Sequence, residues 1–252
     1  MPFSEEARSY ADTRKRTGAE YVRFTPDYRV VLRMLNPKAR TVWKHFISEA
    51  NGGRGMGAVC PNVPGTYICP IEAKYAHLPK EDVERRDNQA RRRFVINVLD
   101  RTPYTICQAC NTKTPGKVNV ASGAKQCVNC GNDIKKHDFA PLNKVKILES
   151  GPKLFNQGLN VIQEMQLSEL GKEITDYDIV FTTQGLGRDR SVTALPGDSK
   201  DLEPEAFLDA DTGEQQQLFD LDLLIEPASV EEITLMMQGA TIEQLNAVRG
   251  IE

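Results

Sequence analysis

Two pairs of cysteines constrain this chain more than any other feature of its sequence. Cys107 and Cys110 form one Cys-x-x-Cys pair, Cys127 and Cys130 form a second, and sixteen residues separate the pairs. This is the spacing of a structural zinc ribbon, in which each pair turns two thiolates toward one point and both pairs complete a tetrahedron. A redox dithiol explains one such pair, but not two at this separation. The spacing therefore predicts a Zn²⁺ site.

The residues around these cysteines offer turns and little apolar surface. Thr114-Pro115-Gly116 and Ser122-Gly123 favour turns, and Gly131 directly follows the second pair. The segment 117–120 is predicted to be a short strand that can bury almost nothing. Metal must therefore replace a hydrophobic core in this ribbon, which is expected to span residues 104–137. A ribbon alone does not indicate a function.

Composition indicates a soluble globular protein. The chain has 252 residues, of which 40 % are hydrophobic and 27 % charged. Its apolar runs are too short to span a bilayer, and residues 1–6 do not resemble a signal peptide. Paired thiols in this context favour a reducing cytoplasm, which would be that of the host for a viral protein.

Charge is distributed unevenly along the chain. Residues 200–252 contain 13 Asp and Glu against only two Lys and Arg, a net charge of −11, whereas residues 1–199 have a net charge of +8. A basic body suits a polyanionic ligand, and an acidic tail suits a partner protein or shielding of the body. Chance clustering of charge in a flexible end is the alternative.

Apolar patterns between turn residues predict a mainly β chain with minor α structure. The predicted strands are 28–35, 41–47, 91–100, 144–149, 178–183 and 190–195. The predicted helices are 79–92, 152–166, 230–237 and 241–248, and the glycine-rich residues 52–57 are expected to form a flexible loop. A small β-barrel with an inserted four-cysteine zinc ribbon is the simplest fold that accommodates these segments. The expected organisation is a basic N-terminal arm (1–20), a core (21–197, ribbon included) and an acidic C-terminal region (198–252).

No catalytic motif is present in the sequence. None of the histidines, His45, His77 and His137, lies in an HExxH motif, and no Walker loop or GxGxxG motif occurs. A binding protein is therefore expected rather than an enzyme.

Basic and aromatic residues in the predicted strands and loops favour single-stranded nucleic acid as the ligand. Cations neutralise phosphates, and unpaired bases stack on aromatic rings. Each ring could instead pack in the core, and each arginine could be a solvated surface charge. The candidates are Tyr28, Arg29, Arg33, Trp43, Lys44, Arg91, Arg92, Arg93, Phe94, Tyr104, Arg188 and Arg190.

The order of several short motifs resembles the T-even-phage type of single-stranded DNA-binding protein. The motifs are Val31-Leu32-Arg33-Met34-Leu35-Asn36-Pro37, a strand carrying His45, Cys60 followed by Cys69-Pro70-Ile71, Arg92-Arg93-Phe94-Val95-Ile96-Asn97-Val98-Leu99, and Gly171-Lys172-Glu173-Ile174-Thr175-Asp176-Tyr177-Asp178-Ile179. The resemblance covers about residues 20–197. It implies an OB-fold, cooperative binding to single strands, and roles in DNA replication, recombination and repair.

The same resemblance assigns roles to both ends of the chain and to a second metal site. Arg14-Lys15-Arg16-Thr17 is similar to the family's cooperativity motif, through which neighbouring copies associate along the strand. The acidic region 198–252 would recruit replication or recombination proteins. The family's zinc site, with one histidine and three cysteines, maps onto His45, Cys60, Cys69 and Glu72. Because Glu72 replaces a cysteine, this site is expected to be degenerate or empty.

Two other functions are compatible with the sequence. A zinc-ribbon transcription accessory factor would dock on RNA polymerase through the Cys107–Cys130 segment and bind single strands poorly. A metal-dependent nuclease would cleave single strands with magnesium, although no spacing of carboxylates requires it. The ribbon itself could also be a contact surface for DNA or protein.

Overall fold

The computed structural model describes most of the chain. The residues that it describes are 19–24, 29–61, 69–110, 113–115, 126–127, 129–133, 140–164, 173–185, 191–197, 202–209 and 212–249. The predicted arm motif Arg14–Thr17, the candidates Tyr28, Arg188 and Arg190, and the predicted strand 117–120 lie outside these ranges.

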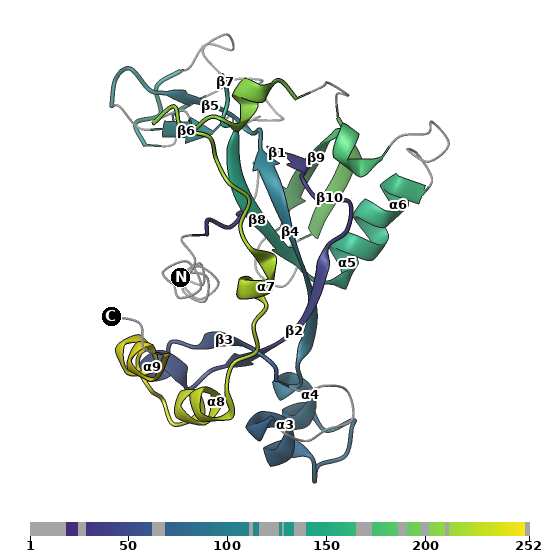
Figure 1. Cartoon of the computed structure of the whole chain (residues 1–252), viewed down its shortest axis with the longest axis vertical. Helices are drawn as coiled ribbons and strands as arrows, with labels where there is room; N and C mark the ends of the chain where they lie inside the picture. Colours follow the sequence, from purple (N-terminus) through teal and green to yellow (C-terminus); the bar gives the residue numbers. More distant parts are fainter. Residues whose placement is uncertain are drawn as a thin grey trace. The chain divides into compact units, whose positions relative to one another are not determined.

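An antiparallel sheet of seven strands dominates the described chain (Figure 1). Its strands are β1 (Arg29–Met34), β2 (Arg40–Ile47), β3 (Met56–Val59), β4 (Arg91–Asp100), β8 (Lys144–Ser150), β9 (Asp178–Gln184) and β10 (Ser191–Pro196). The order is β10-β9-β1-β4-β2-β3, and β8 also pairs with β4. A smaller sheet has the order β6-β5-β7, with β5 at Pro103–Ile106, β6 at Lys113–Pro115 and β7 at Ala140–Pro141. The expectation of a mainly β fold with minor helices is confirmed.

The expectation of a closed barrel is wrong for the described strands. The terminal strands β10 and β3 do not pair with each other. The ten-residue strand β4 pairs with β2 through its first half and with β1 through its second half. The chain divides into two compact units at the middle of β4.

Unit 1 contains Arg40–Val95 and Asp220–Glu252. Besides β2, β3 and the start of β4, its described residues form only short helices. These are α2 (Ala50–Gly53), α3 (Pro70–Tyr75), α4 (Val83–Asn88), α7 (Leu221–Leu224), α8 (Val230–Met237) and α9 (Ile242–Arg249). Residues 52–57, which were expected to form one flexible loop, instead include the end of α2 and the start of β3.

The core of unit 1 combines one side of the β2–β3 ladder with the C-terminal helices. Ile47 and Met56 face each other across the ladder and are almost fully buried. Ile233 and Met236 of α8 and Leu245 of α9 pack in the same cluster and are 0 % exposed. The helices predicted in the acidic region therefore exist, and they supply core side chains.

Unit 2 contains Glu20–Ala39 and Ile96–Phe219. It holds β1, β8, β9, β10, the end of β4 and the smaller sheet. A helical run predicted at 152–166 is present as α5 (Pro152–Leu154), the π-helical turn η2 (Phe155–Leu159) and α6 (Asn160–Ile162), and the 3₁₀ turns η5 (Ile174–Asp176) and η7 (Pro204–Phe207) follow. Its fully buried side chains include Leu32, Leu99, Ile147, Ile179 and Phe181.

The segment 202–219 is held on unit 2 by side-chain amides. Asn97 of β4 donates to the carbonyl of Phe219 at 3.0 Å and accepts from its N–H at 3.1 Å. Gln216 accepts from the N–H of Val145 at 2.7 Å and donates to the carbonyl of Asn143 at 2.7 Å. These pairs reproduce strand-like hydrogen bonding without a strand, and they attach part of the acidic region to the unit.

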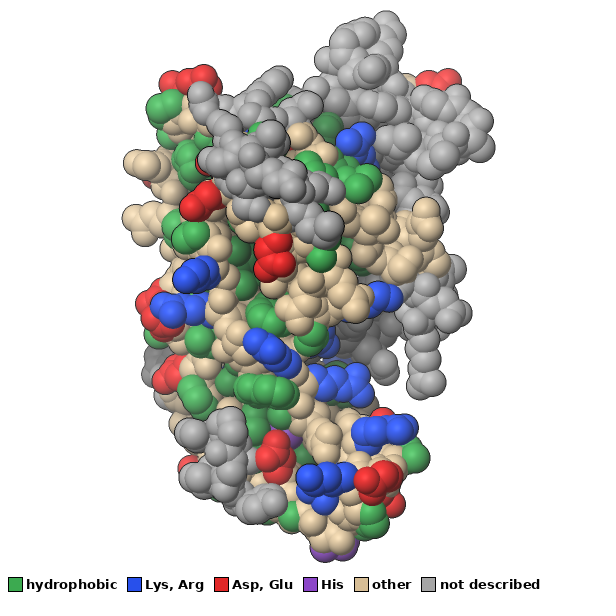
Figure 2. Space-filling model, turned by 90° about the vertical axis from the view of Figure 1, so that its right-hand side faces the viewer, with side chains coloured by type: hydrophobic (Ala, Val, Ile, Leu, Met, Phe, Trp, Pro, Cys, Tyr) green, Lys and Arg blue, Asp and Glu red, His purple; other side chains and the backbone are tan. Residues whose placement is uncertain are grey.

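Surface charge does not form one continuous basic area on the face drawn in Figure 2. In the described part of that face, Lys and Arg side chains lie at several places with hydrophobic and acidic side chains between them. None of the helices in the described ranges is both long enough and apolar enough to span a bilayer.

Candidate metal centres and basic strand side

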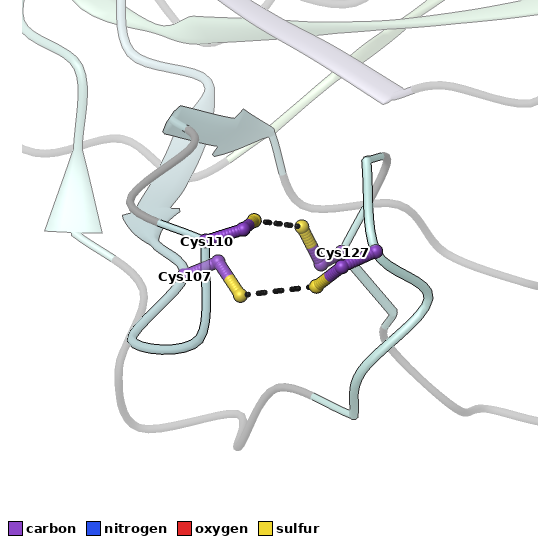
Figure 3. A group of neighbouring side chains, drawn as sticks. Cys107, Cys110 and Cys127 are labelled. Carbon is purple, nitrogen blue, oxygen red and sulfur yellow. Dashed lines mark hydrogen bonds between the residues drawn. The ribbon is translucent and has the colours of Figure 1, made fainter.

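Cys107, Cys110, Cys127 and Cys130 come together at the smaller sheet of unit 2 (Figure 3). Their sulfur atoms lie within 4.8 Å of one another, and all four are free thiols. Sγ of Cys107 is 3.6 Å from Sγ of Cys130, and Sγ of Cys110 is 3.4 Å from Sγ of Cys127. A disulfide requires about 2.05 Å, whereas four sulfurs around Zn²⁺ with Zn–S bonds of about 2.3 Å lie about 3.8 Å apart. The cluster is therefore compatible with a tetrahedral metal site.

Backbone turns explain how each pair converges. The first pair directly follows β5, and the second lies in a tight turn in which Gly131 donates to the carbonyl of Cys127 at 3.0 Å. Gly131 has φ +71°, which a side chain would disfavour. The N–H of Asn129 reaches the sulfur of Cys127 at 3.5 Å. Such N–H contacts favour a thiolate, as metal ligation requires.

Without a cation, the four thiols hinder each other's ionisation. The backbone N–H of Asn132 favours a thiolate at Cys130, but partial desolvation among the other three thiols and hydrogen bonds with them outweigh it and raise the pKa of Cys130 to about 12. A divalent cation among the four sulfurs removes this penalty, because thiolates are its ligands. The donor set thus fits Zn²⁺.

A second cluster lies in unit 1 and contains His45, Cys60 and Cys69, with ligand atoms within 4.8 Å of one another and all three residues buried. Nε2 of His45 is 3.3 Å from Sγ of Cys69. Oε1 of Glu72 is 3.9 Å from both Sγ of Cys60 and Nε2 of His45. Edges of a Zn²⁺ tetrahedron with these donors are about 3.4–3.8 Å. His45, Cys60 and Cys69 therefore fit one ion, and the carboxylate of Glu72 lies near two of these three ligands.

Hydrogen bonding presents His45 as a ligand in one orientation. Its Nδ1 lies 2.9 Å from the carbonyl oxygen of Asn88. Because a carbonyl only accepts, Nδ1 carries the proton and Nε2 is left to bind metal. A backbone carbonyl that fixes the tautomer in this way is common in metal-binding histidines.

Three local structures bring the other ligands to His45. Cys60 follows β3, where its N–H donates to the carbonyl of Trp43 on β2 at 2.8 Å. Cys69 caps α3, and Glu72 lies in the first turn of that helix. Hydrogen bonds from Cys60 and His45 lower the pKa of Cys69 to about 4 against the opposing effect of burial. Burial disfavours the imidazolium, but Cys69 raises the pKa of His45 overall.

The nucleic-acid candidates of unit 1 divide between two sides of the β2–β4 ladder. Residues that face each other across an antiparallel pair point to the same side, and successive residues alternate. Lys44 lies opposite Arg91, and Trp43 lies opposite Arg92. One side, named here the Lys44 side, therefore carries Arg40, Lys44, Arg91 and Arg93. The other side, the Trp43 side, carries Trp43, Arg92 and Phe94.

The two sides differ in what they expose. On the Trp43 side, Trp43 is 44 % exposed, whereas Phe94 is 8 % exposed and lies under the guanidinium of Arg92 at 4.7 Å from the ring centroid. Phe94 is therefore buried and packed against Arg92, which corresponds to the core alternative for this ring. On the Lys44 side, Arg91 is exposed and Arg93 partly exposed, and neither forms an ion pair with any described residue.

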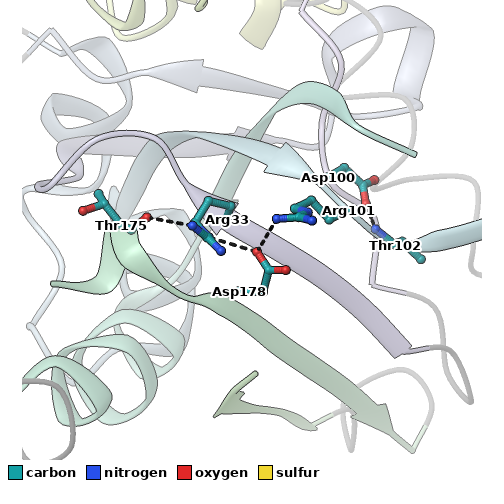
Figure 4. Close-up of polar contacts among 6 residues, drawn as sticks. All are labelled: Arg33, Asp100, Arg101, Thr102, Thr175 and Asp178. Carbon is teal, nitrogen blue, oxygen red and sulfur yellow. Dashed lines mark hydrogen bonds and ion pairs between the residues drawn. The ribbon is translucent and has the colours of Figure 1, made fainter. Parts of the chain in front are cut away.

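Arg33 was predicted to contact nucleic acid, but it is only 2 % exposed. Its Nε donates to Oδ1 of Asp178 at 2.9 Å, and its Nη1 donates to the carbonyl of Thr175 (Figure 4). Arg101 donates to the same Asp178 oxygen at 3.4 Å. Arg33 therefore joins β1 to β9 inside unit 2 and is not available to a ligand. The sequence around Arg33, an arginine among apolar strand residues, does not indicate that Asp178 is its partner.

The remaining candidates in the described residues are Arg29 and Tyr104 of unit 2. Arg29 is exposed at the start of β1, and Tyr104 is half-buried on β5. Sequence reasoning missed two residues on the Lys44 side, Arg40 and Phe46. The two-residue alternation of the predicted strand, which places Phe46 on the same side as Lys44, was the signal that could have identified the ring.

When the chain was compared with known proteins, no family model matched it, and no curated protein matched it at a significant level.

Proposed function

We propose that the protein is a non-enzymatic single-stranded DNA-binding protein of phage replication, recombination and repair, and that the Lys44 side of unit 1 contacts the strand. The placement of Lys44 directly opposite Arg91 carries this proposal. Phosphates that contact cations on that side would release counterions. Arg93 lies on the same side, whereas Arg40 is paired with Asp222 at 3.5 Å, and Val42 and Val95 on that side are buried.

In this proposal, Zn²⁺ has a structural role at both cysteine-containing clusters. In the ribbon it would be held by Cys107, Cys110, Cys127 and Cys130. In unit 1 it would be held by His45, Cys60, Cys69 and Glu72, and this ion would connect β2, β3 and α3 on the side of the sheet opposite Lys44. The strands β1, β4, β8, β9 and β10 of unit 2 would correspond to an opened OB-fold sheet.

The two ends of the chain have proposed roles in assembly. Arg14, Lys15, Arg16 and Thr17 would mediate contacts between neighbouring copies on the strand. The region 198–252 would contact replication or recombination proteins through its acidic exposed residues, while its buried residues remain in the cores. The protein would act in the cytoplasm of the host.

The direct test is titration of a labelled oligo(dT) strand with the full chain at several salt concentrations. Binding with little sequence preference and a steep salt dependence is expected. The double variant Lys44→Ala/Arg91→Ala should reduce the magnitude of the salt slope by about 1.4, since each phosphate contact on a single strand contributes about 0.7. The matched control is Lys80→Ala/Arg86→Ala, which removes two exposed cations of unit 1 outside the β2–β4 ladder.

Stability provides an independent check on the same surface. Arg91→Ala should leave the melting temperature nearly unchanged, because Arg91 is exposed and surface charges contribute little to stability. Binding to one duplex sequence only, or a salt slope that the double variant does not change, would contradict the proposal.

A further inference from the structure

Phe46 occupies an unusual position for a large apolar side chain. It lies on β2 two residues after Lys44, and so on the Lys44 side, and it is 50 % exposed. Its neighbour Ile47, on the other side, is 3 % exposed and belongs to the core of unit 1. The core therefore does not account for the ring of Phe46.

One edge of this ring lies close to the backbone at Gly55. A Cβ atom placed on Gly55 would lie 2.3 Å from Cζ and 2.9 Å from Cε1 of Phe46, so the ring rests where a side chain of residue 55 would be. Gly57 lies opposite Phe46 in the β2–β3 register. By contrast, nothing lies within 4 Å of a Cβ on the nearby Gly52 and Gly53. Gly55 thus leaves the space that the ring occupies, and Gly57 has no side chain opposite the ring.

The surroundings of Phe46 indicate the kind of ligand. Side chains two residues apart on a strand are about 7 Å apart, so the ring lies next to the Lys44–Arg91 pair. Cations that follow a strand backbone, combined with an exposed ring, are the two components of single-strand binding sites. We propose that Phe46 is a stacking platform for a nucleobase whose neighbouring phosphates contact Lys44 and Arg91. This inference depends on the proposed function and identifies the ring that it uses.

A second copy of the chain is a poorer occupant for the same surface. A two-fold interface would bring the same patch of both copies together. That arrangement would place the cations of one copy against those of the other. Charge complementarity therefore favours a polyanion over self-association at Phe46.

The test compares Phe46→Leu with Phe46→Tyr on two ligands, oligo(dT) and an oligonucleotide of equal length with abasic sites. Phe46→Leu retains an apolar side chain but loses the aromatic face, and it should weaken oligo(dT) binding about tenfold. Its binding to the abasic strand and its salt slope should not change, because phosphate contacts remain. Phe46→Tyr should bind both strands as the wild type does. Val83→Ala removes an exposed apolar side chain elsewhere in unit 1 and should have no effect.

The two strands separate a lost platform from a damaged fold. A misfolded Phe46→Leu variant would lose affinity for both strands. In that case Phe46→Tyr decides the question: a retained preference for oligo(dT) over the abasic strand supports the platform, and a lost preference contradicts it. Equal oligo(dT) binding by Phe46→Leu and wild type would overturn the platform while leaving the proposed function intact. A wild-type chain that binds no single strand would overturn both. Loss of a dimer in sedimentation, without loss of DNA affinity, would instead make Phe46 an interface between copies.

Discussion

The two candidate metal centres are surrounded by very different amounts of hydrophobic core. Cys60 and Cys69 of unit 1 belong to a buried cluster that also contains Ile47 and Ile233. In the ribbon of unit 2, Cys107 and Cys127 are buried, but the described segments around them are short strands and turns. Metal at the first centre would add to an existing core, whereas metal at the ribbon would take the place of one.

This difference changes what loss of metal should do. Where ligands lie in a packed core, the apolar side chains still exclude water without the ion. Where ligands are the main contacts between two turns, the metal-binding free energy is the folding free energy. A bound metal ion would therefore contribute less to the stability of unit 1 than to the stability of the ribbon.

Cys127→Ser should have the largest effect of any single substitution in the chain's metal centres and cores. It removes one of four ligands, and the ribbon should lose its metal and unfold locally, because structural Zn²⁺ contributes on the order of 10 kcal/mol in small zinc domains. The loss of one metal equivalent and new proteolytic cleavage within residues 104–137 would be measured. Asn129→Ser places the same side chain between the two cysteines, away from the ligand positions, and should retain the metal. Unchanged metal content in Cys127→Ser would show that the four sulfurs do not form a metal site.

Met236→Ala tests the other half of the comparison. Met236 of α8 is 0 % exposed in the core of unit 1. Its truncation should lower the free energy of unfolding of unit 1 by about 2–5 kcal/mol, in chelator as well as in zinc. Met237→Ala, the partly buried neighbour, is the matched control and should cost less. If Met236→Ala has an effect only when metal is present, unit 1 depends on its ion as much as the ribbon does.

The ribbon could be predicted from the spacing of its cysteines because its ligands are local, whereas the second centre was expected only from the family resemblance. Cys-x-x-Cys turns determine their own geometry. The ligands of the second centre are spread from His45 to Glu72, and they meet only through the β2–β3 register and the start of α3. A family resemblance named these residues, but it did not indicate the carbonyl of Asn88 that orients His45.

A similar division holds for the fold. The long apolar strand 91–100 was predicted with its observed bounds, since its pattern is local. The division of this strand between two units was not predicted, because the division depends on which strands pair with each half of it. Arg33 was misassigned for the same reason, as its partner Asp178 lies 145 residues away.

Glu72→Cys should sharpen the comparison by strengthening the weaker centre. Thiolate is a more usual ligand than carboxylate in closed zinc sites. The variant should bind Zn²⁺ at unit 1 about tenfold more tightly, and Glu72→Ala should bind it about tenfold less tightly. Competition with a chromophoric chelator measures both affinities, and the ribbon provides an internal reference in the same chain. Glu81→Ala, an exposed carboxylate of unit 1, is the control. Equal affinities in all four chains would remove Glu72 from the ligand set.

The smallest effect concerns the ion pair that joins α8 to α9 independently of metal. Burial opposes ionisation of Glu232, but the hydrogen bond from Arg249 lowers its pKa below the ordinary value of 4.5. A carboxyl group with a lowered pKa in the folded state stabilises the fold above its ordinary pKa, and this contribution is lost as the pH falls through the lowered value. Glu232→Gln should therefore cost about 1 kcal/mol at neutral pH, and the difference from wild type should vanish at acid pH. Urea unfolding of both chains between about pH 6 and pH 3 measures this convergence, and each cysteine cluster affects both chains equally, so its loss of metal at low pH cancels. A difference that persists at the lowest pH would mean that the charge of Glu232 is not the source of its contribution, since glutamine can also accept the hydrogen bond from the N–H of Ser229.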